Sequence, residues 1–135
     1  MNKNLRALRF AAAPAAIAAA LLVTTASPAS AWVHDGYLEQ FEFGLYWDAG
    51  QQGCVFDSNN DDPNLTNDYF TGPAGCGGRG QNVNDNTYSY KNLDVYGRYV
   101  YTNSNYSGIR GSVPKGWTGD ASSNFKNSIS SLEWY

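Results

Sequence analysis

Apolar and polar residues alternate over short stretches in residues 32–135, and no long stretch repeats with the period of a helix. Six stretches rich in β-branched and aromatic residues, separated by Asn, Gly, Asp and Ser, predict strands. They span 43–47, 54–56, 88–93, 98–102, 109–113 and 129–134. In the last of them Leu132 and Trp134 alternate with polar neighbours, as in a strand that buries one face. Short strands at this spacing predict an all-β fold, either a sandwich or a small barrel.

The first 31 residues follow a different pattern, which is typical of a secretory signal peptide. Basic residues precede an Ala- and Leu-rich apolar run at 11–23, and small residues occupy the expected cleavage positions at 29–31. A transmembrane anchor is the alternative, but this run, about 13 to 16 residues long, is shorter than the roughly 20 that cross a bilayer. We therefore expect a secreted protein whose single mature domain, residues 32–135, has no membrane attachment after cleavage.

The mature domain is acidic. The whole sequence contains 9 Lys and Arg residues and 12 Asp and Glu residues, and residues 1–31 hold three of the basic residues and none of the acids, which leaves a net charge of −6. Nucleic-acid binding needs clustered basic surface, so we expect no nucleic-acid partner. The only histidine, His34, lies near the mature N-terminus, and no spacing singles out a pair of catalytic carboxylates. We therefore expect a binding protein and not an enzyme.

Cys54 and Cys76 are the only cysteines in the sequence. Because an exported domain folds in an oxidising environment, they are predicted to form a disulfide. By restricting the unfolded chain, the crosslink would stabilise the fold by about 3 kcal/mol in the chain-entropy model. Two free thiols are the alternative.

An internal repeat relates the two halves of the mature domain. Tyr101 is followed by Tyr106 five residues later and by Gly108 two residues further on. Tyr46 and Gly53 repeat the same spacing 55 residues earlier, with a glutamine in place of the second aromatic residue. The repeat predicts two similar folded-over hairpins.

Each half ends in a polar segment that carries a serine, Ser89 in the first half and Ser131 in the second. A folded-over hairpin needs glycine where φ is positive, and a buried serine can bond the exposed hairpin backbone. We expect these serines to lock the kinks at Gly53 and Gly108. The first half is longer by about 13 residues, which we place within 57–80 because this segment is rich in Asn, Asp and Gly.

The aromatic-x4-aromatic-x-Gly hairpin, followed by an [Asn/Asp]-[Asn/Asp]-x-x-[Ser/Thr]-Ser segment, resembles the βγ-crystallin superfamily over residues 45–135. The resemblance implies two Greek-key motifs, about 41–93 and 97–135, that form one sandwich. The runs at 84–92 and 100–108 are similar to a secreted bacterial metalloproteinase-inhibitor family with this fold. That likeness implies peptidase inhibition, with an extracellular protease as the partner. The alternative is an unrelated tyrosine-rich β domain with coinciding spacings.

The superfamily resemblance also implies two calcium sites, each with oxygen ligands from both motifs. The matching side chains are Asn84, Asp85, Asn127 and Ser130. Lys126 stands where an acid or amide is usual, and Tyr88 stands where a ligand hydroxyl is usual, so at least one site should be weak or absent. The other interpretation is that these residues only cap turns. A calcium-stabilised structural or stress protein of the cell exterior is therefore the alternative function, and no cofactor is required.

An inhibitor presents a stiff loop to a protease cleft, because ordering a loop on binding is costly. The predicted disulfide ties the 57–75 insertion to the scaffold, and Tyr69 and Phe70 are its candidate anchors. The alternative is that these two residues form a core strand of the first motif. Trp117 is the best candidate for an exposed ring that binds glycans or the cell wall, which is a weaker alternative function. We expect a monomer.

Overall fold

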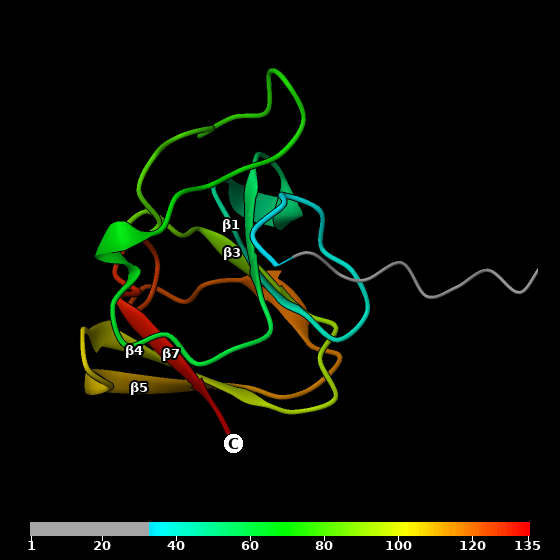
Figure 1. Cartoon of the computed structure of the whole chain (residues 1–135). Helices are drawn as coiled ribbons and strands as arrows, with labels where there is room; N and C mark the ends of the chain where they lie inside the picture. Colours follow the sequence, from blue (N-terminus) through cyan, green and yellow to red (C-terminus); the bar gives the residue numbers. More distant parts are fainter. Residues whose placement is uncertain (1–32) are drawn as a thin grey trace, which may run out of the picture.

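A computed structural model describes residues 33–135 (Figure 1), and the predicted signal peptide at 1–31 lies outside these residues. The described chain forms seven strands and two short 3-10 helices. The strands are β1 (Phe43–Tyr46), β2 (Val55–Ser58), β3 (Ser89–Asn92), β4 (Arg98–Asn103), β5 (Ser107–Val113), β6 (Thr118–Asp120) and β7 (Ser131–Trp134), and the helices are η1 (Ala49–Gln51) and η2 (Leu65–Asn67). None of the helices within residues 33–135 has the length and apolar character that crossing a membrane requires.

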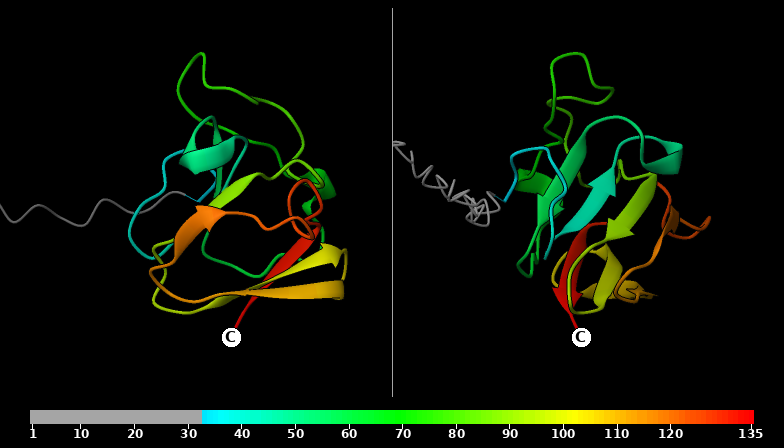
Figure 2. Two further views of the ribbon diagram at one scale, coloured as in Figure 1. Left: turned by 180° about the vertical axis from the view of Figure 1, so that it is seen from behind. Right: turned by 90° about the vertical axis from the view of Figure 1, so that its right-hand side faces the viewer.

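The strands form two antiparallel sheets, which confirms the all-β prediction (Figure 2). One sheet has the order β2-β1-β3-β6 and the other has the order β5-β4-β7. The two halves exchange strands, because β6 of the second half pairs with β3 of the first. In return, Asp62 of the first half forms a two-way backbone bridge with Leu132 of β7. This exchange makes the fold Greek-key-like and joins the halves into one unit.

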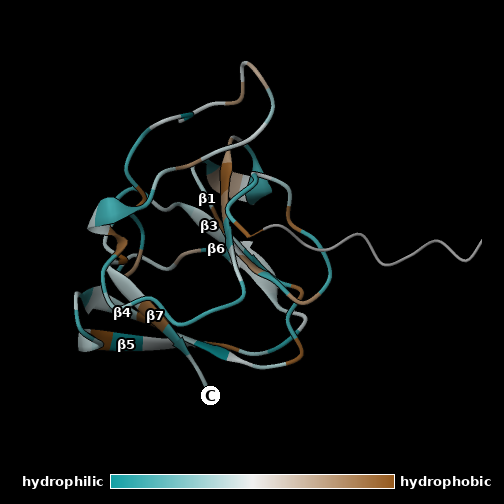
Figure 3. Cartoon of the chain, in the orientation of Figure 1, coloured by the Kyte–Doolittle hydropathy of each residue, from teal (hydrophilic) through white to brown (hydrophobic). Residues whose placement is uncertain are grey.

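The six predicted strands are all present, with ends that differ by up to two residues. The sequence analysis missed β6, because Thr118, Gly119 and Asp120 carry no apolar residue to reveal a buried face. Strand β5 was easier to find, because it contains the β-branched residues Ile109 and Val113. Figure 3 shows strongly hydrophobic colour within this strand.

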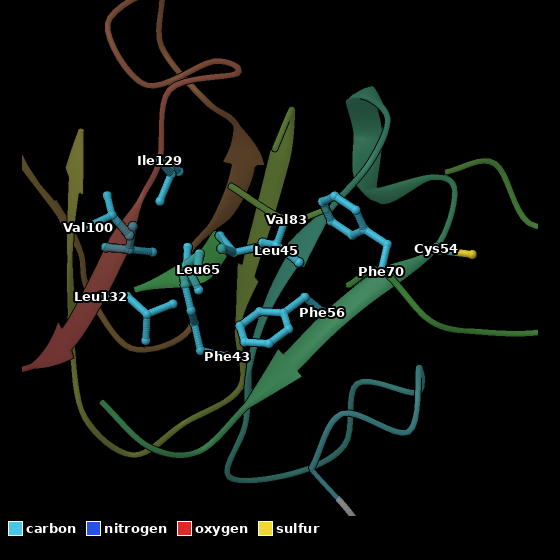
Figure 4. Close-up of a cluster of buried hydrophobic side chains, with 11 residues drawn as sticks. Phe43, Leu45, Cys54, Phe56, Leu65, Phe70, Val83, Val100, Ile129 and Leu132 are labelled. Carbon is cyan, nitrogen blue, oxygen red and sulfur yellow. The ribbon is translucent and has the colours of Figure 1, made fainter. Parts of the chain in front are cut away.

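The hydrophobic core fills the space between the two sheets (Figure 4). Phe43 and Leu45 project into it from β1, and Val100 and Leu132 meet them from the opposite sheet. The insertion of the first half contributes further buried side chains, namely Leu65, Phe70 and Val83. Complete burial of one such side chain stabilises the fold by roughly 1.5–3 kcal/mol.

Arg98 is fully buried, which is unusual for an arginine. Its guanidinium donates to the Asp94 carboxylate at 2.8 Å and to the Asn60 carbonyl at 2.8 Å. It also lies 5.1 Å from the centre of the Trp134 ring. These contacts compensate the buried charge and fasten the insertion to the connection between the halves.

Candidate functional site

The two hairpins are closed by the two serines. Ser89 is fully buried, and its hydroxyl accepts a hydrogen bond from the Gln51 amide at 2.9 Å and donates one to the Asp48 carbonyl at 2.6 Å. The hydroxyl group therefore satisfies one donor and one acceptor of the bent backbone.

Ser131 makes the same pair of bonds in the second half. Its hydroxyl accepts from the Tyr106 amide at 3.1 Å and donates to the Asn103 carbonyl at 2.7 Å. The glycine beside this hairpin is needed, because Gly108 has a φ of +80° and an added Cβ would lie 2.4 Å from the Thr102 hydroxyl oxygen.

Three of the four predicted calcium ligands meet at one place. The Ser130 hydroxyl donates to the Asp85 carboxylate at 3.2 Å, and the Asn84 amide donates to the other oxygen of that carboxylate at 2.8 Å. The Asn84 side-chain oxygen is buried and has no hydrogen-bond partner. An amide oxygen, a carboxylate and a hydroxyl are the ligand types that calcium prefers, so these residues fit a cation. Within residues 33–135 no group of three or more His, Cys, Asp or Glu side chains gathers around a possible metal position.

The fourth predicted ligand, Asn127, lies at the position of the second half that corresponds to Asp85 in the first. The backbone amide of Asn127 donates to the Thr87 carbonyl at 2.7 Å, and the backbone amide of Asp85 donates in the same way to the Ile129 carbonyl at 3.1 Å. Here the Lys126 ammonium lies 3.9 Å from the centre of the Tyr88 ring. These residues do not fit a divalent cation, because an ammonium group repels it and a phenol ring replaces the hydroxyl ligand.

Cys54 and Cys76 form the predicted disulfide, with their Cα atoms 5.2 Å apart. The Cys54 amide also donates to the Gly77 carbonyl at 2.8 Å. A disulfide indicates a non-reducing environment. It braces residues 71–81, which we call the braced loop, and which form part of the green excursion at the top of Figure 1.

Both ends of the braced loop are held by the main chain. Thr71 and Val55 exchange two backbone hydrogen bonds of 3.1 and 3.0 Å, and Gln81 accepts from the Phe70 amide at 2.9 Å. Between these ends, residues 73–75 are exposed, and so is Arg79. The loop is therefore an exposed segment with fixed ends, which preserves its shape.

The Trp47 ring packs against the backbone of the braced loop. An added Cβ at Gly78 would lie 2.2 Å from the Trp47 ring, so only glycine lets the loop backbone approach this ring. The Trp47 ring meets Phe70 edge-on, with 5.7 Å between ring centres. This contact links the loop to the core.

The structure corrects the prediction that Phe70 anchors a protease. Phe70 is completely buried in the core, whereas its neighbour Tyr69 is 53% exposed. The reason is the alternation of side chains along an extended segment, in which the bridges of Tyr69 with Asn82 and of Val55 with Thr71 fix which face turns inward. The alternative interpretation, a core position, is the right one for Phe70. Trp117 is 56% exposed, and its glycan-binding role stays a prediction.

The insertion contains a carboxyl pair that the sequence analysis missed. Burial, and after it the adjacent Asp62 carboxyl, raise the pKa of Asp68 from 3.8 to about 7. Asp68 is only 8% exposed, and one of its buried carboxyl oxygens has no hydrogen-bond partner among the described residues. The Asp68 carboxyl therefore holds its proton at a higher pH than an exposed aspartate does. The six-residue separation of Asp62 and Asp68 gave no signal, because only the folded loop brings them together.

No protein-family model matches this sequence, and no curated protein matches it. Solved structures match it in shape. A structure described under the evolution of the eye lens βγ-crystallin domain fold aligns with a TM-score of 0.58 and 17% identity, and covers 74% of this chain and 90% of that chain. A βγ-crystallin from Ciona intestinalis aligns with a TM-score of 0.53 and 12% identity, over 70% of this chain and 99% of its own.

The N-terminal domain of protein S also aligns, with a TM-score of 0.52 and 16% identity, over 70% of this chain and 94% of its own length. At these identities the likeness concerns the fold. It agrees with the two serine-locked hairpins and with the exchange of strands between the halves. This chain therefore has a βγ-crystallin-like fold.

Proposed function

We propose that this protein is a secreted, monomeric, non-enzymatic inhibitor of an extracellular peptidase, and that the braced loop enters the cleft of the enzyme. The observation that carries the proposal is the fixing of an exposed segment by a disulfide, by backbone bonds at both ends and by the Trp47 ring. A loop ordered before binding loses little conformational entropy when the complex forms. The resemblance of the sequence to a peptidase-inhibitor family supports the same function.

The bracing also explains how such a loop resists turnover. If a peptidase cuts a bond within residues 73–75, Thr71 stays paired with Val55 on one side. On the other side, the disulfide to Cys54 retains Cys76. Both new ends therefore remain in the cleft, where resynthesis of the bond competes with release.

The test is a titration of the purified protein into thermolysin-like, subtilisin-like and trypsin-like peptidases. The trypsin-like enzyme is included because Arg79 is exposed in the braced loop. We expect stoichiometric loss of activity for at least one class. Absence of inhibition at micromolar excess over every class removes this function.

A variant pair locates the inhibitory surface. Ala74→Glu places a charge on an exposed position of the braced loop and should weaken inhibition at least tenfold. Trp117→Ala changes an exposed side chain outside the loop and should leave inhibition unchanged. Equal inhibition by both variants would assign the activity to another surface.

Calcium binding is the second candidate function, as in a structural or stress protein of the cell exterior. The specific observation is the unpartnered, buried oxygen of Asn84 beside the Asp85 carboxylate and the Ser130 hydroxyl. The oxygen atoms of these three side chains would coordinate one cation, and this coordination would replace the hydrogen bonds that now join the side chains. The position of Asn127 and Lys126 would remain without one, so the expected stoichiometry is one ion per chain.

Terbium luminescence tests this second function, together with the melting temperature in calcium, which should rise for a calcium-binding module. Asp85→Asn should abolish both signals, and the matched change Asn127→Ala should leave them in place. No displaceable lanthanide binding would end the calcium proposal. The inhibition assay, repeated with and without calcium, separates the two functions.

A further inference from the structure

A cavity of about 190 Å³ lies between the two sheets, on the side where β5 and β6 form their outer edges. We call it the edge pocket. Neither strand has a partner on its outer side in the sheets described. The segment 121–128, which follows β6, contributes Ala121, Ser122 and Phe125 to the walls.

The inner wall of the edge pocket is apolar. Phe43, Val100, Val113 and Ile129 line it, and each of them is at least 95% buried. The half-buried rings of Tyr90 and Phe125 complete the lining.

The absence of a side chain at Gly111 sets the position of the Phe125 ring. A Cβ added at Gly111 would lie 2.8 Å from this ring, so glycine allows the ring to lie against β5. The ring forms one wall of the cavity and does not fill it.

The rim is polar and exposed. Ser112, Asp120 and Ser122 lie on it, and all three are exposed to solvent. One carboxylate oxygen of Asp120 accepts from the Gly50 amide at 2.7 Å, and Gly50 does not line the cavity. In the pairing of β6 with β3, Asp120 lies opposite Ser89, whereas the cavity-lining Tyr90 lies opposite Gly119, so the Asp120 carboxylate turns away from the cavity. The pocket thus runs from an apolar interior to a polar mouth.

We propose that the edge pocket binds a small uncharged aromatic molecule. An apolar protein cavity of roughly 150 Å³ stays dry and takes up benzene, so a cavity of about 190 Å³ suits a ring or a pair of fused rings. Burial of the ring supplies the affinity. A charged group inside the apolar wall would lose its hydration without compensation.

Indole is the probe, because it is an uncharged bicyclic ring. Titration of indole into the ¹⁵N-labelled protein should saturate, with the largest amide shifts at Val113, Ile129 and Asp120. Indole-3-acetate should bind at least tenfold more weakly. Absence of saturating shifts, or shifts located away from the lining residues, overturns the proposal.

A pair of neighbouring exposed serines provides the control. Ser122 lines the pocket, whereas Ser123 is exposed and does not line it. Ser122→Trp should block the mouth and weaken indole binding at least tenfold, while Ser123→Trp should bind as the unchanged protein does. Neither side chain belongs to the core, so both variants should keep the fold, which their amide spectra report. Equal affinity of the two variants would show that indole does not use this pocket.

Discussion

In the first half of the domain Ser89 bonds the backbone of Asp48 and Gln51, and in the second half Ser131 bonds the backbone of Asn103 and Tyr106. The hairpin positions are offset by 55 residues and the serines by 42, so the 13 extra residues of the first half lie between hairpin and serine. Both halves therefore have the same pair of serine hydrogen bonds, although the segment between the hairpin and its serine differs in length.

The halves differ in what that joining segment does. In the first half it supplies Phe70 to the core, a disulfide and the carboxyl pair of Asp62 and Asp68. In the second half the corresponding segment supplies β6, the short segment over the edge pocket, and the core residues Val113 and Ile129. Backbone geometry therefore constrains the hairpins, while the insertions between them are free to acquire separate roles.

The largest expected loss of stability comes from removing the side chain that the insertion contributes to the core. Phe70→Ala removes a completely buried ring that supports Trp47, and it should lower the free energy of unfolding by about 3–5 kcal/mol. Tyr69→Ala, at the exposed neighbouring position, should change it by less than about 0.5 kcal/mol. Urea denaturation measures both. Similar losses for the two variants would contradict the assignment of Phe70 to the core.

The disulfide comes next, because only the first half is crosslinked. Replacement of Cys54 and Cys76 by alanine should cost about 3 kcal/mol. Native-state hydrogen exchange should show the loss of protection concentrated at Val55 and Thr71, whose backbone bonds hold the braced loop. Protection at Val100 in the second half should fall less. A uniform loss across both halves would mean that the crosslink stabilises the whole domain and not the insertion.

The serine locks should give smaller effects that match between the halves. Ser89→Ala and Ser131→Ala each remove the partner of one part-buried amide and one part-buried carbonyl, so each should cost about 1–3 kcal/mol. Ser123→Ala, at an exposed position, is the control. Thermal denaturation in one buffer allows direct comparison. A large loss for one serine and none for the other would show that the two hairpins are not equivalent.

Local pattern was enough to predict much of this fold. The six strands follow from short alternating stretches, and the pairing of Ser89 and Ser131 with the hairpins follows from the repeat. The disulfide follows from the presence of only two cysteines in a chain that is predicted to be exported. These features depend on residues whose own chemistry limits where they can lie.

Features that depend on the path of the insertion were not predictable in this way. Phe70 and Tyr69 are adjacent aromatic residues, and only the bridges to neighbouring segments decide which of them turns inward. The carboxyl pair and the buried Arg98 likewise result from contacts made through space. Strand β6 is recognisable only from its pairing with β3.

The smallest expected effect uses pH to sharpen the comparison, because the Asp62–Asp68 pair belongs to the first half alone. The pKa of Asp68 is raised from 3.8 to about 7, first by burial and then by Asp62. The folded state therefore binds a proton that the unfolded state releases at lower pH. This contribution to stability is complete below about pH 4 and is lost as the pH rises through about 7. The melting temperature should fall by a few degrees between pH 5 and pH 8.

Asp68→Asn keeps an uncharged side chain at every pH, so it should reduce that fall. Some of the fall should remain, since burial also raises the pKa values of Glu42 and Asp57. Ser123→Ala changes an exposed side chain that carries no carboxyl group, so it is the control and should leave the pH dependence unchanged. If Asp68→Asn and the unchanged protein lose the same number of degrees, the proton is not held at this pair. The pH response would then come from other buried carboxyls such as Glu42 and Asp57, and the Asp68 position would contribute packing alone.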